Sequence, residues 1–159
     1  MSASQPLTAS GVTIVPGRYG SAVRVNGQDQ LVYDAGGRID PAAGSVQLWV
    51  RPEWVWNDDR EHVFLEIGTP QAGNGQDGYF LRLAKADWNG LYAWLGDGTR
   101  EVGLYGDIGS WAPGIWHHLA LAWQAVQPGT DFHRYTLWID GVLEDSQVLR
   151  RPAAGSPSQ

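Results

Sequence analysis

The sequence contains no cysteine, so it can form no disulfide, offers no thiol nucleophile and cannot hold a metal ion through thiolates. Basic residues are also few. Eleven lysines and arginines stand against 17 acidic residues, which gives a net charge of −6, and the longest basic run is Arg150–Arg151. Because nucleic-acid binding needs a concentrated positive patch, this charge balance argues against such a partner.

Long apolar runs are missing as well. No stretch approaches the roughly 20 apolar residues that cross a bilayer as a helix. Residues 1–10 are polar and lack the apolar centre of a secretory signal, so we expect a flexible segment there. Residues 150–159 are rich in Pro, Ala, Gly and Ser and predict a flexible tail or the start of a linker. One domain over residues 11–149 remains, either part of a longer protein or one that needs no conventional signal.

A helical period is the third absence, because no run of a dozen residues keeps apolar side chains at a 3.6-residue spacing. At most, one helical turn fits near Pro41–Gly44. Short β-type runs instead recur about every ten residues, separated by turn signals. The predicted strands are Val12–Val15, Ala22–Asn26, Gln30–Tyr33, Ser45–Arg51, His62–Ile67, Tyr79–Ala84, Gly90–Leu95, Arg100–Tyr105, Trp116–Gln124, Tyr135–Asp140 and Val142–Leu149. The sequence thus predicts an all-β, two-sheet antiparallel sandwich.

Two hairpins have clear turn signals. Asp140-Gly141 lies between two apolar runs, which is the strongest short hairpin signature. Gly96-Asp97-Gly98 joins two further strands, and Trp88-Asn89-Gly90 forms the turn before them. Residues 79–105 are therefore expected to form a three-stranded meander.

Four segments, in order, resemble the laminin-G-like, concanavalin A-like jelly-roll family. They are Arg18–Gly27 with its Gly-x-x-Gly-x-Ala-like opening, Ser45–Pro52 with a central tryptophan, the Trp-His-His strand Trp116–Trp123, and the closing hairpin Leu137–Val142. The resemblance implies a jelly roll. Members of this family include adhesion domains, carbohydrate-binding modules attached to glycosidases, and phage tail components, so the fold indicates binding without naming a ligand.

The sequence contains nine tryptophans and six tyrosines, and their positions in the predicted strands indicate which of them face the core. Strand alternation places Trp123 with the core residues Leu119 and Leu121. The same alternation places another aromatic set on the opposite faces, beside Gln47, Arg51, Arg82 and Asp140. That set is Trp49, Phe80, Tyr92, Trp94 and Trp138. Two interpretations stay open: a surface that stacks sugar rings, or a second minor core covered by loops or a partner.

Tryptophans also occur in predicted loops, where recognition residues are common. Trp54 and Trp56 lie in the charged segment 53–60, and Trp88 and Trp111 lie in other loops. The 53–60 segment either binds a ligand or folds back on the sheet edge. The residues predicted to bind ligand are Trp49, Arg51, Trp54, Trp56, Arg82, Tyr92, Trp94 and Trp138.

Catalysis is not expected. The glucanase branch of the family carries Glu-x-Asp-x-x-Glu on one strand, and this motif is absent among only five glutamates. Glu66 could face the same side as Asp140, but no motif supports the pair. His117 and His118 are adjacent on a strand and point to opposite faces, so they cannot hold one metal ion together.

Calcium is a weightier possibility, because it prefers carboxylate and carbonyl oxygens. The resemblance implies an Asp just before a strand such as Gly78–Leu81, which is Asp77 here, with a second acidic residue for which Asp145 is a candidate. The alternative is that Asp77 only shapes its turn. Asp97 and Asp140 are expected to be turn residues.

We therefore expect a non-catalytic binding module. The first hypothesis is carbohydrate recognition or adhesion outside the cell, with a glycan or a cell-surface protein as partner. The second is a structural phage-tail, virion or surface-appendage component, whose aromatic face would be a protein interface, including one between copies of this chain. The third, ranked last, is a glycoside hydrolase. The corresponding location is extracellular, cell-surface or virion-associated.

Overall fold

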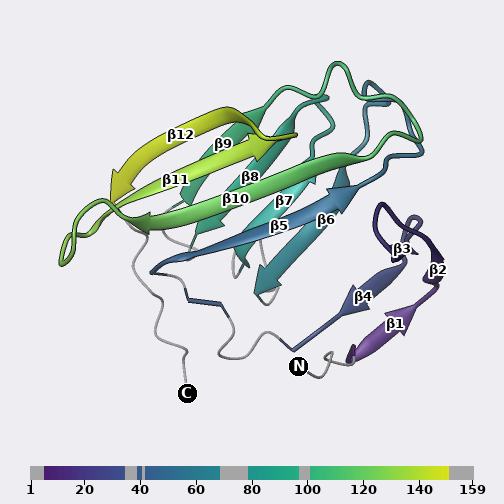
Figure 1. Ribbon diagram of the computed structural model, residues 1–159, viewed down its shortest axis with the longest axis horizontal. Coiled ribbons are helices and arrows are strands. Elements are labelled where there is room, and N and C mark those ends of the chain that lie inside the picture. Colours follow the sequence, from purple (N-terminus) through teal and green to yellow (C-terminus); the bar gives the residue numbers. More distant parts are fainter. Residues whose placement is uncertain (1–5, 35–38, 41, 69–78, 97–100, 151–159) are drawn as a thin grey trace. The chain divides into compact units, whose positions relative to one another are not determined.

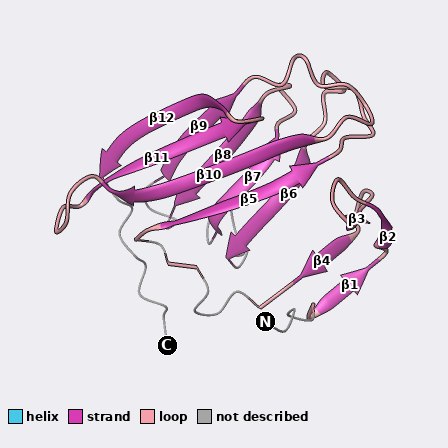
Figure 2. Ribbon diagram, in the orientation of Figure 1, coloured by secondary structure: helices cyan, strands magenta, loops and turns pink. Residues whose placement is uncertain are grey.

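The computed structural model describes residues 6–34, 39–40, 42–68, 79–96 and 101–150. The chain divides into two compact units, residues 1–39 and 40–159. Within the described residues every regular element is a strand (Figure 2). The single helical turn expected near Pro41–Gly44 is not found in its described part, where Ala42 and Ala43 form a turn and a bend and Gly44 already begins a strand. No described helix is long and apolar enough to cross a membrane.

The N-terminal unit holds two small antiparallel sheets. β1 (Thr8–Ser10) pairs with β4 (Gln30–Val32), and β2 (Thr13–Pro16) pairs with β3 (Ser21–Arg24). β1 falls in the segment expected to be flexible, and it is the one described strand that the sequence pattern did not predict. Its short polar run, Thr-Ala-Ser, carries no apolar alternation from which a strand could be inferred.

The second unit is a sandwich of two four-stranded antiparallel sheets. In Figure 1 the nearer layer, here the front sheet, has the order β12-β11-β10-β5. These strands are β5 (Gly44–Val50), β10 (His117–Ala125), β11 (Phe132–Ile139) and β12 (Val142–Arg150). The layer behind it, the back sheet, is the meander β6-β7-β8-β9. Its strands are β6 (His62–Gly68), β7 (Tyr79–Lys85), β8 (Leu91–Gly96) and β9 (Glu101–Gly106).

Two of the predicted turns, at Asp140-Gly141 and at Trp88-Asn89-Gly90, lie within the described residues. Asp140 and Gly141 have φ angles of 52° and 82°, and Ile139 pairs with Val142, so this is the two-residue turn with both residues left-handed that favours Asp-Gly. Asn89, with φ of 69°, sits in the turn between β7 and β8. Asp97 and Gly98 lie outside the described residues, although Gly96 and Glu101 pair on either side of them. The predicted meander is thus confirmed.

The core lies between the two sheets, where alternate side chains of both meet. Leu119 pairs across the front sheet with Leu48 and Ile139, and Leu121 pairs with Leu137. The back sheet supplies fully or almost fully buried residues, namely Leu81, Leu83, Leu91, Ala93, Leu95, Val102 and Leu104. Trp123 is 1% exposed, as predicted, and its indole N–H donates to the Asp40 carbonyl at 2.9 Å. The two-sheet sandwich expected from the sequence is confirmed.

Candidate functional site

The predicted ligand-binding residues do not form one surface. Trp49 and Trp138 lie on the front sheet, whereas Arg82, Tyr92 and Trp94 lie on the back sheet. Strand alternation placed them correctly on faces turned away from the core. Because the outer faces of the two layers of a sandwich point in opposite directions, the residues cannot meet the same ligand together.

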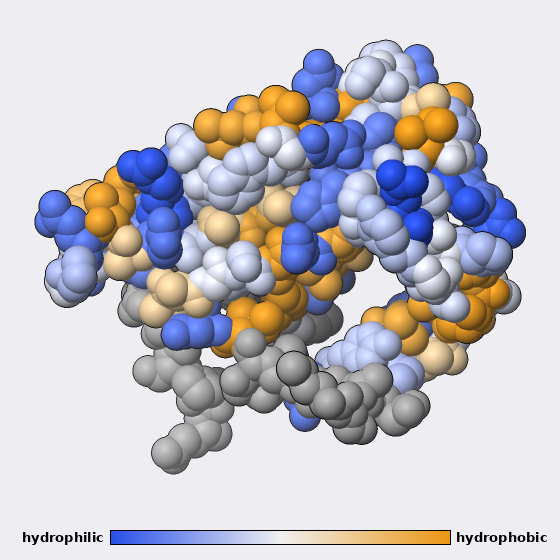
Figure 3. Space-filling model, viewed as in Figure 1, coloured by the Kyte–Doolittle hydropathy of each residue, from blue (hydrophilic) through white to orange (hydrophobic). Residues whose placement is uncertain are grey.

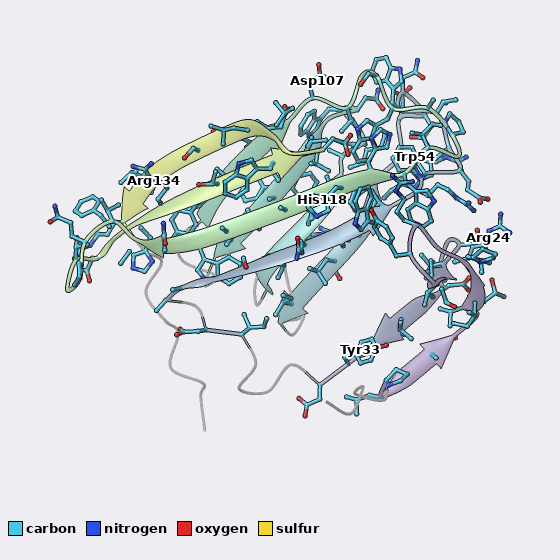
Figure 4. The ribbon with its side chains drawn as sticks, in the orientation of Figure 1. Arg24, Tyr33, Trp54, Asp107, His118 and Arg134 are labelled. Carbon is cyan, nitrogen blue, oxygen red and sulfur yellow. The ribbon has the colours of Figure 1, made fainter. Side chains whose placement is uncertain are left out.

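The outer face of the front sheet carries a tryptophan–histidine–tryptophan group. Trp49 stands opposite His118 on the neighbouring strand, with ring centroids 5.0 Å apart, and is 38% exposed. His118 Nε2 lies 3.2 Å from the Gln47 side-chain oxygen. Figure 4 labels His118 on this layer. The pairing of His118 with Trp49 depends on the register of β5 against β10, which the sequence pattern does not specify.

The two tryptophans of this face stand on the strands that flank β10, with His118 and Ala120 of β10 between them. Trp138 is half-buried and pairs with Ala120, which in turn pairs with Gln47. The next row contains Ala122 flanked by Ser45 and Thr136. With two strand spacings across and two residues along, Trp49 and Trp138 stand about 12 Å apart at their backbones. We call the outer surface formed by these three rows of side chains the Trp49–Trp138 face.

On the back sheet, Tyr92 and Trp94 belong instead to a second minor core, the alternative left open by the sequence. Tyr92 is only 7% exposed and packs with Ala84 and Ala86, and Trp94 contacts this cluster edge-on to Tyr92 at 6.2 Å. The Tyr92 hydroxyl donates to Glu61 at 2.6 Å. Burial, together with this hydrogen bond, raises the pKa of Tyr92 far above its usual value. The side chain of Phe80 lies outside the described residues.

Arg82 is held by two carboxylates. Its Nη2 lies 2.9 Å from Glu61 and its Nε lies 2.9 Å from Glu66. Glu66 therefore contacts Arg82 on the back sheet, while Asp140 lies at a front-sheet turn, 2.7 Å from His117 Nδ1. The structure does not bring Glu66 and Asp140 together.

The adjacent histidines point to opposite faces, as predicted. His117 is 8% exposed and stacks on Trp111 at 4.3 Å, whereas His118 lies on the outer face. Asp140 accepts from the His118 backbone N–H at 2.7 Å as well. This carboxylate therefore serves the turn and fixes the start of β10.

The 53–60 loop folds back on the sandwich through Trp54. The indole stacks on His62 at 4.3 Å and lies 6.4 Å from Trp111. Trp56 is 36% exposed in the same loop. Arg51 lies beside the loop, 3.3 Å from Glu53 and 5.4 Å from the Trp116 ring. Trp54 thus takes the alternative role that the sequence left open, since its ring is occupied by neighbours.

Beneath Trp54 lies a buried ion pair that the sequence did not suggest. The Lys85 ammonium, with no exposed surface, is 2.8 Å from Asp58 Oδ1 and 2.8 Å from the Arg60 carbonyl oxygen. It also donates to the Ala86 carbonyl at 3.1 Å and to the Asn89 side-chain oxygen at 3.0 Å. Burial alone would raise the pKa of Asp58, but hydrogen bonds from Lys85 and His62 outweigh it and lower this pKa to about 2.

Of the two residues predicted to bind calcium, Asp77 lies outside the described residues. Asp145 Oδ2 accepts the Tyr105 backbone N–H and the Gln147 amide, each at 3.1 Å. Within the described part of the chain no three His, Asp or Glu side chains gather closely enough to hold a metal ion. Calcium bound by Asp77 and Asp145 stays a prediction.

Comparison with known proteins gives one match. The family model Laminin_G_3, described as the concanavalin A-like lectin/glucanases superfamily, matches residues 25–158, a range that includes residues of both units. No curated protein and no solved structure gives a significant match. The matched range covers most of the chain and agrees with the observed two-sheet sandwich. The chain therefore belongs to the concanavalin A-like lectin/glucanase superfamily, within the laminin-G-like family that its four motifs resemble.

Proposed function

We propose that the chain is a carbohydrate-binding module that binds a glycan on the Trp49–Trp138 face. The observation that carries the proposal is the pair of outward-facing tryptophans on the two strands that flank β10, with His118 and Ala120 of β10 between them. Indole faces match the apolar C–H faces of pyranose rings, and the small side chain of Ala120 leaves room beside Trp138 for a ring to approach the sheet.

The polar groups of this face suit a neutral sugar. Gln47 and His118 lie beside Trp49, and Ser45 and Ser146 lie at the ends of the next row. They are uncharged or weakly basic groups that exchange hydrogen bonds with hydroxyls. On the back sheet, by contrast, Arg82 is already held by two glutamates and Tyr92 is buried. These contacts favour the front sheet as the binding surface.

We also propose that the module is non-catalytic. Retaining and inverting glycosidases need an acid and a second carboxylate placed across the sugar. Glu61 and Glu66 both form ion pairs with Arg82 on the back sheet, and Glu61 also accepts the Tyr92 hydroxyl. Neither carboxylate lies on the Trp49–Trp138 face, where the proposed glycan would bind. A glycan ligand would place the module outside the cell.

The test is a glycan-array screen of the full chain, with and without calcium, followed by calorimetry on the best ligand. We expect Trp49→Ala and Trp138→Ala each to weaken binding roughly tenfold or more, as loss of a stacking ring does at a binding centre. Trp88→Ala, which removes an exposed tryptophan from the β7–β8 turn of the back sheet, is the matched control and should bind as the parent chain does. Binding that survives both front-sheet variants would refute this site.

A second function is favoured by one specific observation. β12 is the last strand of the front sheet among the described strands and exposes Val142, Leu143, Val148 and Leu149 by between 39% and 61%. Figure 3 shows apolar colour along this strand at the upper edge. An exposed apolar edge strand can pair with another chain, as a virion or appendage subunit would require.

The two functions predict different solution masses. In an assembly subunit, light scattering would show a stable oligomer that Val148→Lys converts to monomer, with no glycan bound. Val148 is exposed on β12 and pairs with Arg134, four residues along β11 from Trp138. For the glycan-binding module we therefore expect binding to be independent of Val148→Lys. An oligomer without any glycan ligand would therefore replace the first proposal with the second.

A further inference from the structure

An open hollow of about 440 Å³ is lined by none of the residues of the proposed glycan site. It is formed by the β7–β8 turn, the end of β9 and the beginning of β12. The lining residues are Trp88, Asn89, Gly90, Tyr105, Gly106, Asp107 and Glu144. Figure 4 labels Asp107, whose side chain points outward at the upper edge of the sandwich unit.

Two aromatic rings form one side of the hollow. Trp88 is 56% exposed and Tyr105 is 48% exposed, with ring centroids 6.0 Å apart and planes inclined by 58°. Both rings rest on glycine. A Cβ on Gly90 would overlap the Trp88 ring, and one on Gly103 would come within 2.9 Å of the Tyr105 hydroxyl. The glycines therefore let the rings lie close to the backbone, which limits their freedom while leaving other ring surface exposed.

Two carboxylates complete the hollow. Glu144 accepts the Asp107 backbone N–H at 3.2 Å, and Asp107 accepts the Gly109 N–H at 2.7 Å. Among the described residues neither carboxylate pairs with an arginine or a lysine. The nearby Lys85 is buried and already paired with Asp58. The hollow thus joins aromatic surface to uncompensated negative charge, in a chain whose net charge is −6.

From this combination we propose that the hollow binds a small organic cation with an apolar surface, a quaternary alkylammonium group. The positive charge of such a group is spread over its methyl groups, which pack against ring faces and are attracted by the ring quadrupoles. The carboxylates add a direct charge interaction, which a neutral sugar would not use. The inference concerns a second ligand and does not depend on the glycan proposal.

The test compares choline with 3,3-dimethyl-1-butanol, its neutral analogue of the same shape, at constant ionic strength because salt screens exposed charges. Binding to the full chain is followed through the indole N–H signals in ¹H–¹⁵N spectra, with the Trp88 signal assigned from Trp88→Phe. We expect choline to move the Trp88 signal saturably and the neutral analogue to bind roughly tenfold more weakly. Trp138→Ala should leave this titration unchanged.

A second variant keeps the proposal testable if loss of Trp88 disturbs the turn. Glu144→Gln with Asp107→Asn retains the shape of both side chains and removes their charge, so it should weaken choline binding roughly fivefold, which corresponds to about 1 kcal/mol. Equal binding of choline and its neutral analogue would overturn the proposal. So would displacement of choline by the glycan found on the array, or the absence of any saturable shift up to about 100 mM choline, well beyond millimolar affinity.

Discussion

At the scale of single residues, the ammonium of Lys85 is surrounded by four oxygen atoms between 2.8 and 3.1 Å away. This side chain ties the 58–60 loop to the β7–β8 turn, because its oxygen partners come from both. A buried ammonium is tolerated only when it is paired and hydrogen-bonded, and removing one partner of such a pair typically costs several kcal/mol.

We predict that Asp58→Asn lowers the free energy of unfolding by about 3–5 kcal/mol, because it leaves the Lys85 charge buried without its carboxylate. The double variant Asp58→Asn with Lys85→Met should recover part of this loss, since no unpaired charge then remains. Urea denaturation at pH 7 measures both, with the exposed Asp87→Asn as a control. A loss below about 1 kcal/mol for Asp58→Asn, the level of an exposed ion pair, would show that the pair is not structural.

The same carboxylate predicts a dependence on pH. The pKa of Asp58 falls from 3.8 to about 2 on folding, so its contribution to stability is complete above pH 4 and is lost as the pH falls toward 2. The shift corresponds to about 2 kcal/mol. The stability difference between the parent chain and Asp58→Asn should therefore shrink by about that amount between pH 4 and pH 2. A difference independent of pH over this interval would contradict the assignment.

Nothing in the sequence indicated this cluster. Lys85 stands at the end of a predicted strand, where a lone lysine is ordinarily exposed. Asp58 and Asn89 are 27 and 4 residues away along the chain, and each fits a turn by its residue type. Their convergence depends on the pairing of β6 with β7, which brings His62 beside Lys85. Local pattern carries no information about such a contact.

At the scale of elements, the β11–β12 hairpin depends on two left-handed residues, Asp140 and Gly141. Asp140 also binds His117 and the start of β10, so a disturbance of the turn reaches the neighbouring strand. The turn between β11 and β12 is therefore held both by its own backbone conformation and by the contacts of Asp140 with β10.

We expect Gly141→Ala to lower the free energy of unfolding by about 1–2 kcal/mol, because a φ of 82° places a Cβ close to the backbone. Gly141→Asn, which tolerates this conformation, should lose less. Thermal denaturation of the two variants provides the comparison. Equal losses would show that the cost arises from the surroundings of residue 141 instead of its backbone angle.

Alternation along the strands predicted which side chains face away from the core, and Trp49, Tyr92, Trp94 and Trp138 all follow it. It could not predict which sheet each strand joins. A period of two residues fixes the face of a strand, whereas the partner strands depend on the topology of the whole chain. The strand residues among the predicted binding residues were therefore placed on correct faces but not on one surface.

At the scale of the whole sandwich unit, the two outer faces have different characters. The front sheet turns tryptophans and small residues outward, and the back sheet turns outward a cluster whose charges are paired with one another. Core side chains separate the two outer faces. A substitution on one face therefore removes no contact made by residues of the other face.

We therefore predict that Trp49→Ala and Trp94→Ala change the free energy of unfolding additively, within about 0.5 kcal/mol, in a double-mutant cycle. Tyr92→Phe with Trp94→Ala is the contrasting pair, because these rings touch, and it should deviate from additivity by more. A coupling above about 1 kcal/mol between Trp49 and Trp94 would mean that the sandwich transmits changes between its faces.

The burial of Lys85 also has a practical chemical consequence. It is the only lysine, it has no exposed surface, and the chain has no cysteine. Apart from the α-amino group of the chain, the folded protein therefore presents neither an amine nor a thiol to acylating or alkylating reagents. Immobilisation through amines would therefore attach every molecule of this chain by its α-amino nitrogen. Because Lys85 can react only when the loop over it opens, the rate of Lys85 acylation would measure how often that loop opens.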